Sequence, residues 1–362
     1  MRVSSLLIPI VVACSSSEDP AATFDTTSPD GQGGGTGDVS VAEDVPLPGD
    51  TAEPPACGEV CGDAVSPAPI APLLVLQGDA YPESVDFDPI SRRFFVTNLK
   101  RGDVSAVDVQ TGASTVFHAG NGDGWLTLGL DTDAERRRLW VCGVLGKTLE
   151  RGELWQLDLD TGERLLTVDL TTARPGGACA DFARDADGGV YVTDRQAGRI
   201  YHSALDGELR VAVEDDLLAP VVIGQNGVVL HPSQKVLISG QYLPVRLLRS
   251  DLSDPAAPVV TALELDVSFL EGGADDMVAV GDTLFVIVED RLVEVALGGD
   301  AWSTASITTT TPLWEDGDET VGGFSGIALA EGALYASRSD VVLFGFDQPS
   351  ERPFVIKHVG VP

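Results

Sequence analysis

One phrase recurs six times along the 362 residues of this chain and constrains its fold more than any other feature. Each copy has a short apolar stretch, a turn rich in Asp, Gly, Pro or Ser, and then a run of β-branched and aromatic residues. The intervals between copies vary only from 45 residues (83 to 128) to 52 residues (128 to 180), the length of one four-stranded propeller blade. The sequence therefore predicts an all-β, six-bladed β-propeller over residues 72–362. The copies begin at Glu83, Leu128, Ala180, Asn226, Asp275 and Ser325.

The strand boundaries carry turn signals that support this fold. Four copies run on into a further strand, and two of these strands end in Asp-x-x-Thr-Gly, in which Gly supplies the positive φ of a hairpin turn. A β-sandwich would leave the internal period unexplained, and no long stretch shows the 3.6-residue period of a helix. Either of two segments is a candidate for the outermost strand that closes the ring, "APLLVLQG" (71–78) near the start or "PFVIKHVG" (353–360) at the end.

The N-terminus has the features of an export signal. Residues 1–13 of "MRVSSLLIPIVVAC" carry one Arg and then an apolar run far shorter than the roughly 20 residues that a bilayer-spanning helix needs, and are predicted to be a signal peptide. The stretch "VVAC" resembles a bacterial lipobox, in which the cysteine, here Cys14, is lipidated after cleavage. By the same resemblance Ser15 favours the outer membrane of a two-membrane (Gram-negative) bacterium. The alternative is an ordinary secretory signal with an incidental cysteine.

Residues 14–71 form a polar spacer. They are rich in Gly, Ser, Thr, Pro and Asp and contain no Lys or Arg, so we expect a disordered tether. Cys57 and Cys61 stand four residues apart in this segment with no nearby His. A zinc site would lack ligands there, so a local disulfide is the expectation for an exported protein.

The charge of the chain limits its partners. Only 23 basic residues face 56 acidic ones, which leaves a formal net charge of -33. Such a potential repels nucleic acid and anionic lipid head groups. We therefore expect no nucleic-acid partner, membrane contact only through the lipid anchor, and cations or neutral molecules as ligands.

The first residues of the six copies predict a site. In a propeller the innermost strands all begin at the same face, so these six residues form a ring. The ring contains two carboxylates, one amide and one hydroxyl, from Glu83, Asp275, Asn226 and Ser325. Carboxylate and amide oxygens are the ligands that Ca²⁺ prefers, whereas no His or Cys cluster indicates zinc or copper.

Residues 80–340 resemble the gluconolactonase, senescence-marker-protein and regucalcin-like superfamily of six-bladed propellers. The phrases that carry the resemblance are "YPESVDFDP", "GRIYHSALDG", "GQNGVVLHPSQ" and "GGADDMVAVGDTLFVI". It implies one site for Ca²⁺ or another divalent cation, held by Glu83, Asn226 and Asp275. It also implies that Asp275 is the general base for the opening of a lactone.

The chain departs from that family at two ring positions. Ala180 stands where the family has an Asn, so that only Asp181 remains there to contact substrate. Asp276 replaces a Gly, and we expect it either to raise the pKa of Asp275 by repulsion or to point into solvent. Asn98 and Asp194 end second strands, so we expect them near the same face and in contact with ligand.

The two remaining cysteines, Cys142 and Cys179, fall at the ring face of adjacent blades. This placement predicts a disulfide between blades two and three, with two separate buried thiols as the alternative.

Three functional hypotheses follow. The first is a calcium-dependent lactone or ester hydrolase, monomeric and anchored to the cell envelope, that acts on a small neutral lactone or sugar-like molecule. The second is a non-catalytic propeller that binds a ligand or a protein at the envelope. In the third, the ring residues bind no ligand and only pack the central channel of the fold.

Overall fold

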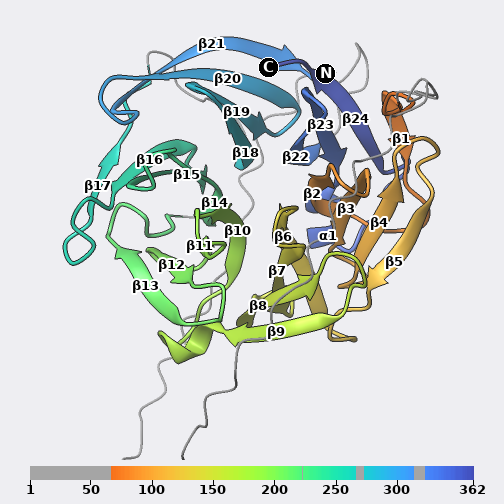
Figure 1. The fold of residues 1–362 in the computed structure, drawn as a ribbon, viewed down its shortest axis with the longest axis horizontal. Helices are drawn as coiled ribbons and strands as arrows, with labels where there is room; N and C mark the ends of the chain where they lie inside the picture. Colours follow the sequence, from red (N-terminus) through yellow and green to blue (C-terminus); the bar gives the residue numbers. More distant parts are fainter. Residues whose placement is uncertain (1–66, 222, 266–272, 314–322) are drawn as a thin grey trace, which may run out of the picture. The chain divides into compact units, whose positions relative to one another are not determined.

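The computed structural model describes residues 67–362 with gaps at residue 222, residues 266–272 and residues 314–322. Six four-stranded antiparallel sheets stand around a common axis (Figure 1). The predicted all-β, six-bladed propeller is therefore confirmed. The compact unit begins at Ala68, four residues before the predicted start at residue 72. The predicted signal peptide, Cys14, Cys57 and Cys61 lie outside the described residues.

Five blades are built from consecutive strands that follow one another outwards from the axis. Blade 1 contains β2 (Pro82–Asp88), β3 (Arg93–Asn98), β4 (Val104–Asp108) and β5 (Ser114–His118). Blade 2 contains β6 (Trp125–Asp133), β7 (Arg138–Leu145), β8 (Arg151–Asp158) and β9 (Arg164–Asp169). Blade 3 contains β10 (Cys179–Arg184), β11 (Val190–Asp194), β12 (Arg199–Ser203) and β13 (Leu209–Glu214). Blade 4 contains β14 (Ile223–Leu230), β15 (Val236–Leu243), β16 (Arg246–Asp251) and β17 (Val259–Ala262). Blade 5 contains β18 (Ala274–Val280), β19 (Thr283–Val288), β20 (Arg291–Gly298) and β21 (Thr304–Pro312).

The sixth blade joins the two ends of the propeller. It consists of β22 (Phe324–Ala330), β23 (Ala333–Arg338), β24 (Val355–Gly360) and, outermost, β1 (Leu73–Val75). Leu74 pairs with Ile356 in this sheet. Both terminal segments therefore belong to the closing blade, and the N-terminal one supplies its outer edge. The described helices are short: η1 (Leu170–Thr172) and α1 (Val341–Gly345). Among the described residues no helix is both long and apolar enough to cross a membrane.

The Asp-x-x-Thr-Gly segments form the hairpin turns that the sequence predicts. In the turn after β4, Oδ1 of Asp108 accepts hydrogen bonds from the backbone of Gln110 and Thr111. Gly112 then takes a φ of 72°, which a side chain would oppose. The turn after β8 repeats this arrangement with Asp158 and Gly162. The Asp residues of these repeats are thus turn formers.

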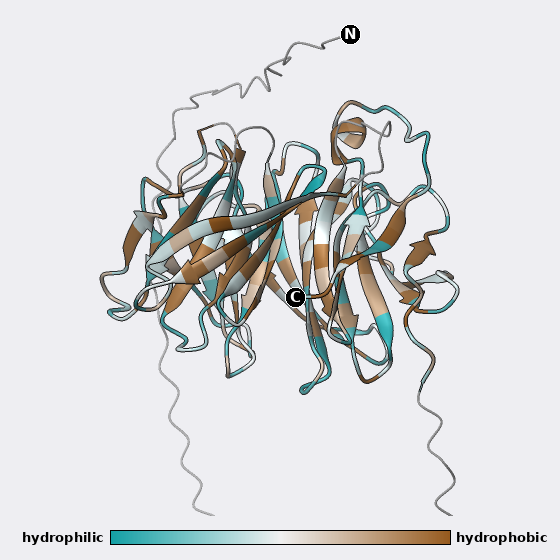
Figure 2. Cartoon of the chain, turned by 90° about the horizontal axis from the view of Figure 1, so that it is seen from above, coloured by the Kyte–Doolittle hydropathy of each residue, from teal (hydrophilic) through white to brown (hydrophobic). Residues whose placement is uncertain are grey.

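The core lies between neighbouring blades. Trp155 of blade 2 is fully buried and packs in one cluster with Phe95 and Val104 of blade 1. Trp140 is also fully buried and donates a hydrogen bond from Nε1 to the carbonyl of Gly188 in blade 3. Figure 2 shows hydrophobic stretches along the strands and hydrophilic residues at many of the turns. Because each blade buries its faces against its neighbours, the ring positions of all six are held rigidly.

Candidate functional site

A β-bulge interrupts every innermost strand near its start. The pairing of the first two strands shifts by one residue in all six blades, for example between Pro82 and Val85 in blade 1 and between Ala274 and Met277 in blade 5. A bulge re-aims the side chains that it contains. The bulges contain the six residues of the predicted ring, Glu83, Leu128, Ala180, Asn226, Asp275 and Ser325. We call the end of the propeller where they lie the start face.

The three predicted metal ligands come from three different blades. Glu83 lies on β2, Asn226 on β14 and Asp275 on β18, and each exposes 6 % of its surface or less. The Asn226 side-chain amide donates a hydrogen bond to Oδ1 of Asp275, so blades 4 and 5 meet at this point. Rotation of this amide by 180° presents its oxygen instead of its nitrogen.

The two carboxylates of this site are buried and repel each other. Burial raises the pKa of Glu83 to about 7, against the lowering effect of Arg195. Burial also raises the pKa of Asp275 well above its usual range, and the Glu83 charge is the strongest of the neighbouring charges that add to this. A cation bound between them would relieve both effects. The donor set of two carboxylates and one amide therefore fits a hard divalent cation such as Ca²⁺.

The candidate site has fewer acidic ligands than a metal site made of protein side chains alone usually has. No group of three or more His, Cys, Asp or Glu side chains in these residues is arranged to hold a metal ion. Of the three proposed ligands two are carboxylates and the third is an amide. Any further ligands would have to be water or backbone oxygens.

Asp276 bridges two blades. Its Oδ1 accepts a hydrogen bond from the backbone nitrogen of Met277 at 2.6 Å, and its Oδ2 accepts one from Ile327 in blade 6 at 2.9 Å. Burial raises its pKa to about 7. Its charge also raises the pKa of Asp275, as expected, but less than burial and the Glu83 charge do. The expectation that it points into solvent is wrong, because both oxygens accept backbone hydrogen bonds, although the residue is only half-buried.

Asp181 of blade 3 interacts with Asp276 of blade 5. A hydrogen bond between the two carboxyl groups, for which one must carry a proton, raises the pKa of Asp181 and lowers that of Asp276. Oδ2 of Asp181 also accepts a hydrogen bond from the backbone of Val228 at 3.3 Å. The neighbouring ring position, Ala180, is fully buried and supplies no polar side chain. Blade 3 thus contributes the carboxyl group of Asp181, which already interacts with Val228 and Asp276.

Asn98 and Asp194, for which ligand contacts were predicted, are hydrogen-bonded within the protein. The Asn98 amide donates to the carboxylate of Asp103 and to Oγ of Ser105 within its own blade, and 1 % of the residue is exposed. Asp194 is fully buried. Its Oδ1 accepts from three backbone nitrogens, and its Oδ2 lies 3.1 Å from the Tyr201 hydroxyl. Both side chains are therefore occupied in holding hairpins.

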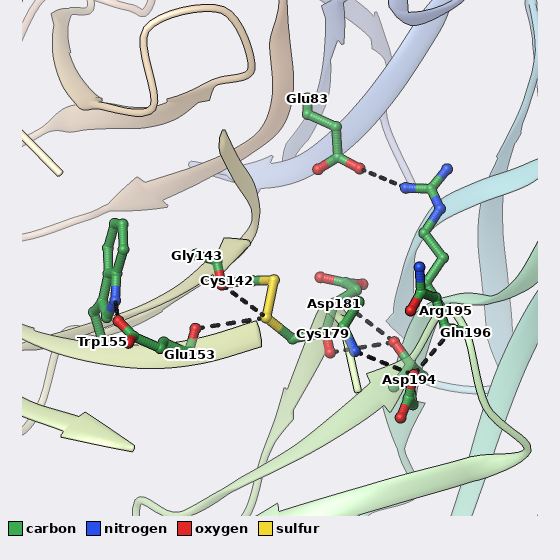
Figure 3. The surroundings of a disulfide bond; sticks show 12 residues. Glu83, Cys142, Gly143, Glu153, Trp155, Cys179, Asp181, Asp194, Arg195 and Gln196 are labelled. Atoms are coloured by element: carbon green, nitrogen blue, oxygen red, sulfur yellow. Dashed lines mark hydrogen bonds and ion pairs between the residues drawn. A yellow bond between two sulfur atoms is a disulfide. The ribbon is translucent and has the colours of Figure 1, made fainter. Parts of the chain in front are cut away.

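Arg195 is the site residue that the sequence reasoning missed. It follows β11 directly, one residue beyond Asp194, and Nη1 lies 3.6 Å from Oε1 of Glu83 (Figure 3). Its Cζ lies 5.6 Å from the centre of the Tyr242 ring. Burial raises the pKa of this tyrosine, and the charges of Asp275 and Glu289 add to the effect. The position of Arg195 could have indicated a role in the site, because residues that directly follow a second strand lie at the start face.

The predicted disulfide joins blades 2 and 3 beside this site. Cys142 on β7 and Cys179 on β10 are bonded, with their Cα atoms 5.7 Å apart. Figure 3 shows Asp181 beside this bond and the Arg195 side chain reaching towards Glu83. The prediction of a disulfide is confirmed, and the alternative of two separate thiols is wrong. The bond fixes the start of β10, and hence the bulge that carries Ala180 and Asp181.

A cavity of about 640 Å³ lies at the opposite end of the axis, where the innermost strands finish. Asp86, Asp131 and Arg184 line it, and Nη1 of Arg184 lies 2.6 Å from Oδ2 of Asp131. None of the predicted ligands belongs to its lining. We place the candidate site at the start face, because Asn226 bonds to Asp275 there and the charge of Glu83 acts on the same carboxyl group.

Comparisons with known proteins show the fold. Neither protein-family profiles nor curated protein sequences match the chain. Among solved structures, the allergen Mala s 1 of Malassezia sympodialis has a TM-score of 0.64 at 17 % identity, over 80 % of this chain and 96 % of that one. A gluconolactonase of Xanthomonas campestris has a TM-score of 0.56 at 15 % identity, over 82 % and 99 %. A regucalcin of Agrobacterium tumefaciens, named as a calcium-binding protein, has a TM-score of 0.53 at 16 % identity, over 81 % and 97 %. The chain thus shares the six-bladed propeller fold of gluconolactonase- and regucalcin-like proteins.

Proposed function

We propose that this protein hydrolyses a lactone or another ester at the start face and that it needs one divalent cation, Ca²⁺ in the first instance. The observation that carries the proposal is the convergence of Glu83, Asn226 and Asp275 from three blades, each at a bulge and each buried. The shared fold with a gluconolactonase and a regucalcin supports it.

Glu83, Asn226 and Asp275 would hold the cation. When bound there, Ca²⁺ supplies Lewis-acid polarisation of the ester carbonyl. Their burial excludes bulk water, which strengthens each of these contacts. Glu83 and Asp275 would give up their protons on metal binding, because the cation favours the charged form of both.

Asp275 would serve as the general base. Its carboxylate takes a proton from the water whose oxygen attacks the acyl carbon, and the ring C–O bond then breaks. The proton passes to the leaving alkoxide, so the product is a hydroxy acid and Asp275 is restored. Before the cation binds, the Asn226 amide donates a hydrogen bond to Asp275 and so fixes the position of its carboxyl group. With a net charge of -33, the protein favours a neutral substrate such as a sugar-like lactone.

The proposed place of action is the cell envelope. Cys14 would carry the lipid, and the acidic tether would hold the propeller away from the membrane surface. Radiolabelled palmitate incorporation, compared between the natural chain and Cys14→Ser, tests this part separately. Loss of the label in Cys14→Ser is the expected result, and equal labelling would contradict the proposal.

The function itself is tested with a panel of aldonolactones and aryl esters, assayed with Ca²⁺ and with EDTA. We expect hydrolysis that EDTA abolishes and that Asp275→Asn lowers by about 100-fold or more, the contribution typical of a general base. Glu214→Gln is the control, because this exposed carboxylate lies on β13, the outer strand of blade 3, and pairs there with Arg174. Equal activity of Asp275→Asn and the natural chain would overturn the assignment.

A non-catalytic ligand- or protein-binding propeller is the second candidate. Two observations favour it: Ala180 brings no polar side chain to the ring, and Arg195 stands beside the proposed metal ligands. Stoichiometric Ca²⁺ binding that Asp275→Asn abolishes, together with no turnover of any member of the panel, is the result expected for this candidate.

A further inference from the structure

A cationic side chain already lies among the proposed metal ligands. Arg195 extends from the β11–β12 hairpin of blade 3 to blade 1, where Nη1 lies 3.6 Å from Oε1 of Glu83 (Figure 3). The two side chains expose only 14 % and 6 % of their surface. The same positive charge lowers the pKa of Asp275 on blade 5. The guanidinium therefore acts on both carboxylates that would bind the cation.

The backbone of Arg195 is fixed between two blades. Its nitrogen donates to the carbonyl of Ala178 at 2.8 Å, and its carbonyl accepts from the nitrogen of Gly224 at 3.2 Å. A Cβ on Gly224 would lie 2.4 Å from that carbonyl oxygen, so the close approach needs a glycine. The base of the side chain is thus anchored, and only its long stem can move.

The guanidinium itself is held loosely. It makes no direct hydrogen bond to any side chain or carbonyl among the described residues, whereas Arg137 binds both oxygens of Asp88 at 2.9 Å. The face of Tyr242, 5.6 Å away, offers it a second attractive surface. A calcium ion would approach a carboxylate to 2.3–2.6 Å, closer than the 3.6 Å of Arg195.

We infer that Arg195 is a tethered counter-cation that competes with the divalent cation for Glu83 and Asp275. Buried carboxylates need a positive charge nearby, and the guanidinium supplies it when no metal is bound. Metal binding must push the guanidinium away, because two cations at one place repel each other. The affinity for Ca²⁺ is then set by the difference between two free energies, that of Ca²⁺ binding to the carboxylates and that of the guanidinium interacting with them. This inference rests on the metal site of the proposed function.

The test is a calorimetric Ca²⁺ titration of the full chain, beside Arg195→Ala and Arg195→Gln. We expect both variants to bind Ca²⁺ at least about tenfold more tightly, because removal of a cation a few ångströms away leaves the carboxylates unpaired. Arg174→Ala is the control, since it also removes one positive charge, but from the segment between η1 and β10, where Arg174 forms an exposed ion pair with Glu214 of blade 3. Its affinity should stay within about twofold of the natural chain. Arg195→Gln keeps much of the stem, in case the alanine variant folds poorly.

The outcomes separate the inference from the proposed function. Binding that Asp275→Asn abolishes but that neither Arg195 variant strengthens would overturn the competition and leave the metal site standing. If neither the natural chain nor either folded Arg195 variant binds Ca²⁺, both the competition and the metal site are overturned. A site from which Arg195 has been removed should bind a cation if it is a metal site at all. Tighter binding in the Arg174→Ala control as well would mean that overall charge, and not Arg195, sets the affinity.

Discussion

Oδ2 of Asp276 accepts a hydrogen bond from the backbone nitrogen of Ile327 at 2.9 Å, and so ties the innermost strand of blade 5 to that of blade 6. Two other carboxylates reach the next blade in the same way. Asp86 accepts from Thr132 at 2.7 Å, and Asp181 accepts from Val228 at 3.3 Å. Blades 1, 3 and 5 each bind the following blade through an aspartate of the innermost strand, of which Asp181 is buried and Asp86 and Asp276 are half-buried.

The first prediction concerns this tie. Asp276→Ala should lower the free energy of unfolding by about 1–3 kcal/mol, because the nitrogens of Met277 and Ile327 lose their acceptor. Asp276→Asn keeps an acceptor oxygen and should lose less. Urea unfolding of both variants at pH 5.5, with the exposed Glu208→Ala as control, measures the difference. Equal losses in the two variants would show that the acceptor does not matter.

The second prediction concerns pH. Glu83 and Asp276 have folded-state pKa values raised to about 7, above their usual values near 4. The stability that they contribute is complete below about pH 4 and is lost as the pH rises through about 7. In EDTA the chain should therefore unfold more easily at pH 8 than at pH 5.5, by on the order of 2 kcal/mol. The pKa of Asp88 is lowered to about 2, so this group stabilises the fold more as the pH rises. That change takes place below about pH 4, outside the range compared here.

Asp276→Asn provides the matched comparison for this pH dependence. It removes one of the titrating groups, so its loss of stability between pH 5.5 and pH 8 should be smaller than that of the natural chain. Thermal or urea unfolding at both pH values measures it. A natural chain that grows more stable over this range would contradict the raised pKa values.

The third prediction concerns the disulfide. Replacement of both Cys142 and Cys179 by Ser should cost about 2–4 kcal/mol, because the bond closes a loop over a sequence separation of 37 residues. Chemical unfolding and thiol titration measure the effect. The control is Cys57→Ser with Cys61→Ser, which precedes the compact unit and should leave its stability unchanged. A loss of the same size in both pairs would contradict a specific role for the inter-blade bond.

The fourth prediction concerns the closing blade. Leu74 on β1 is 1 % exposed, while its neighbour Leu73 is 52 % exposed. Leu74→Ala should lower the free energy of unfolding by about 2–4 kcal/mol, because it leaves a cavity under the outermost strand. Leu73→Ala should change it by less than about 0.5 kcal/mol. If the two variants are equally stable, β1 does not hold the ring closed.

Much of the architecture could be predicted from the sequence because the signals for a blade are local. The Asp-x-x-Thr-Gly turns act within five residues, and the alternation of apolar residues acts within one strand. Repetition of these signals placed Glu83, Asn226 and Asp275 at equivalent positions before any contact was known. The same alignment placed Cys142 and Cys179 in adjacent blades, although their pairing needed the measured separation.

Only the tertiary structure decided what depends on neighbours far along the chain. Arg195 lies beside Glu83 although 112 positions (195 minus 83) separate them, and no local pattern encodes that approach. The same holds for Asp276, which bonds to Ile327 in the next blade, and for β1, which completes a sheet with β24. Hydrophobic periodicity determines that a residue belongs to a strand. Closure of the ring determines which charges share one buried space, and there burial and Coulomb interactions set their chemistry.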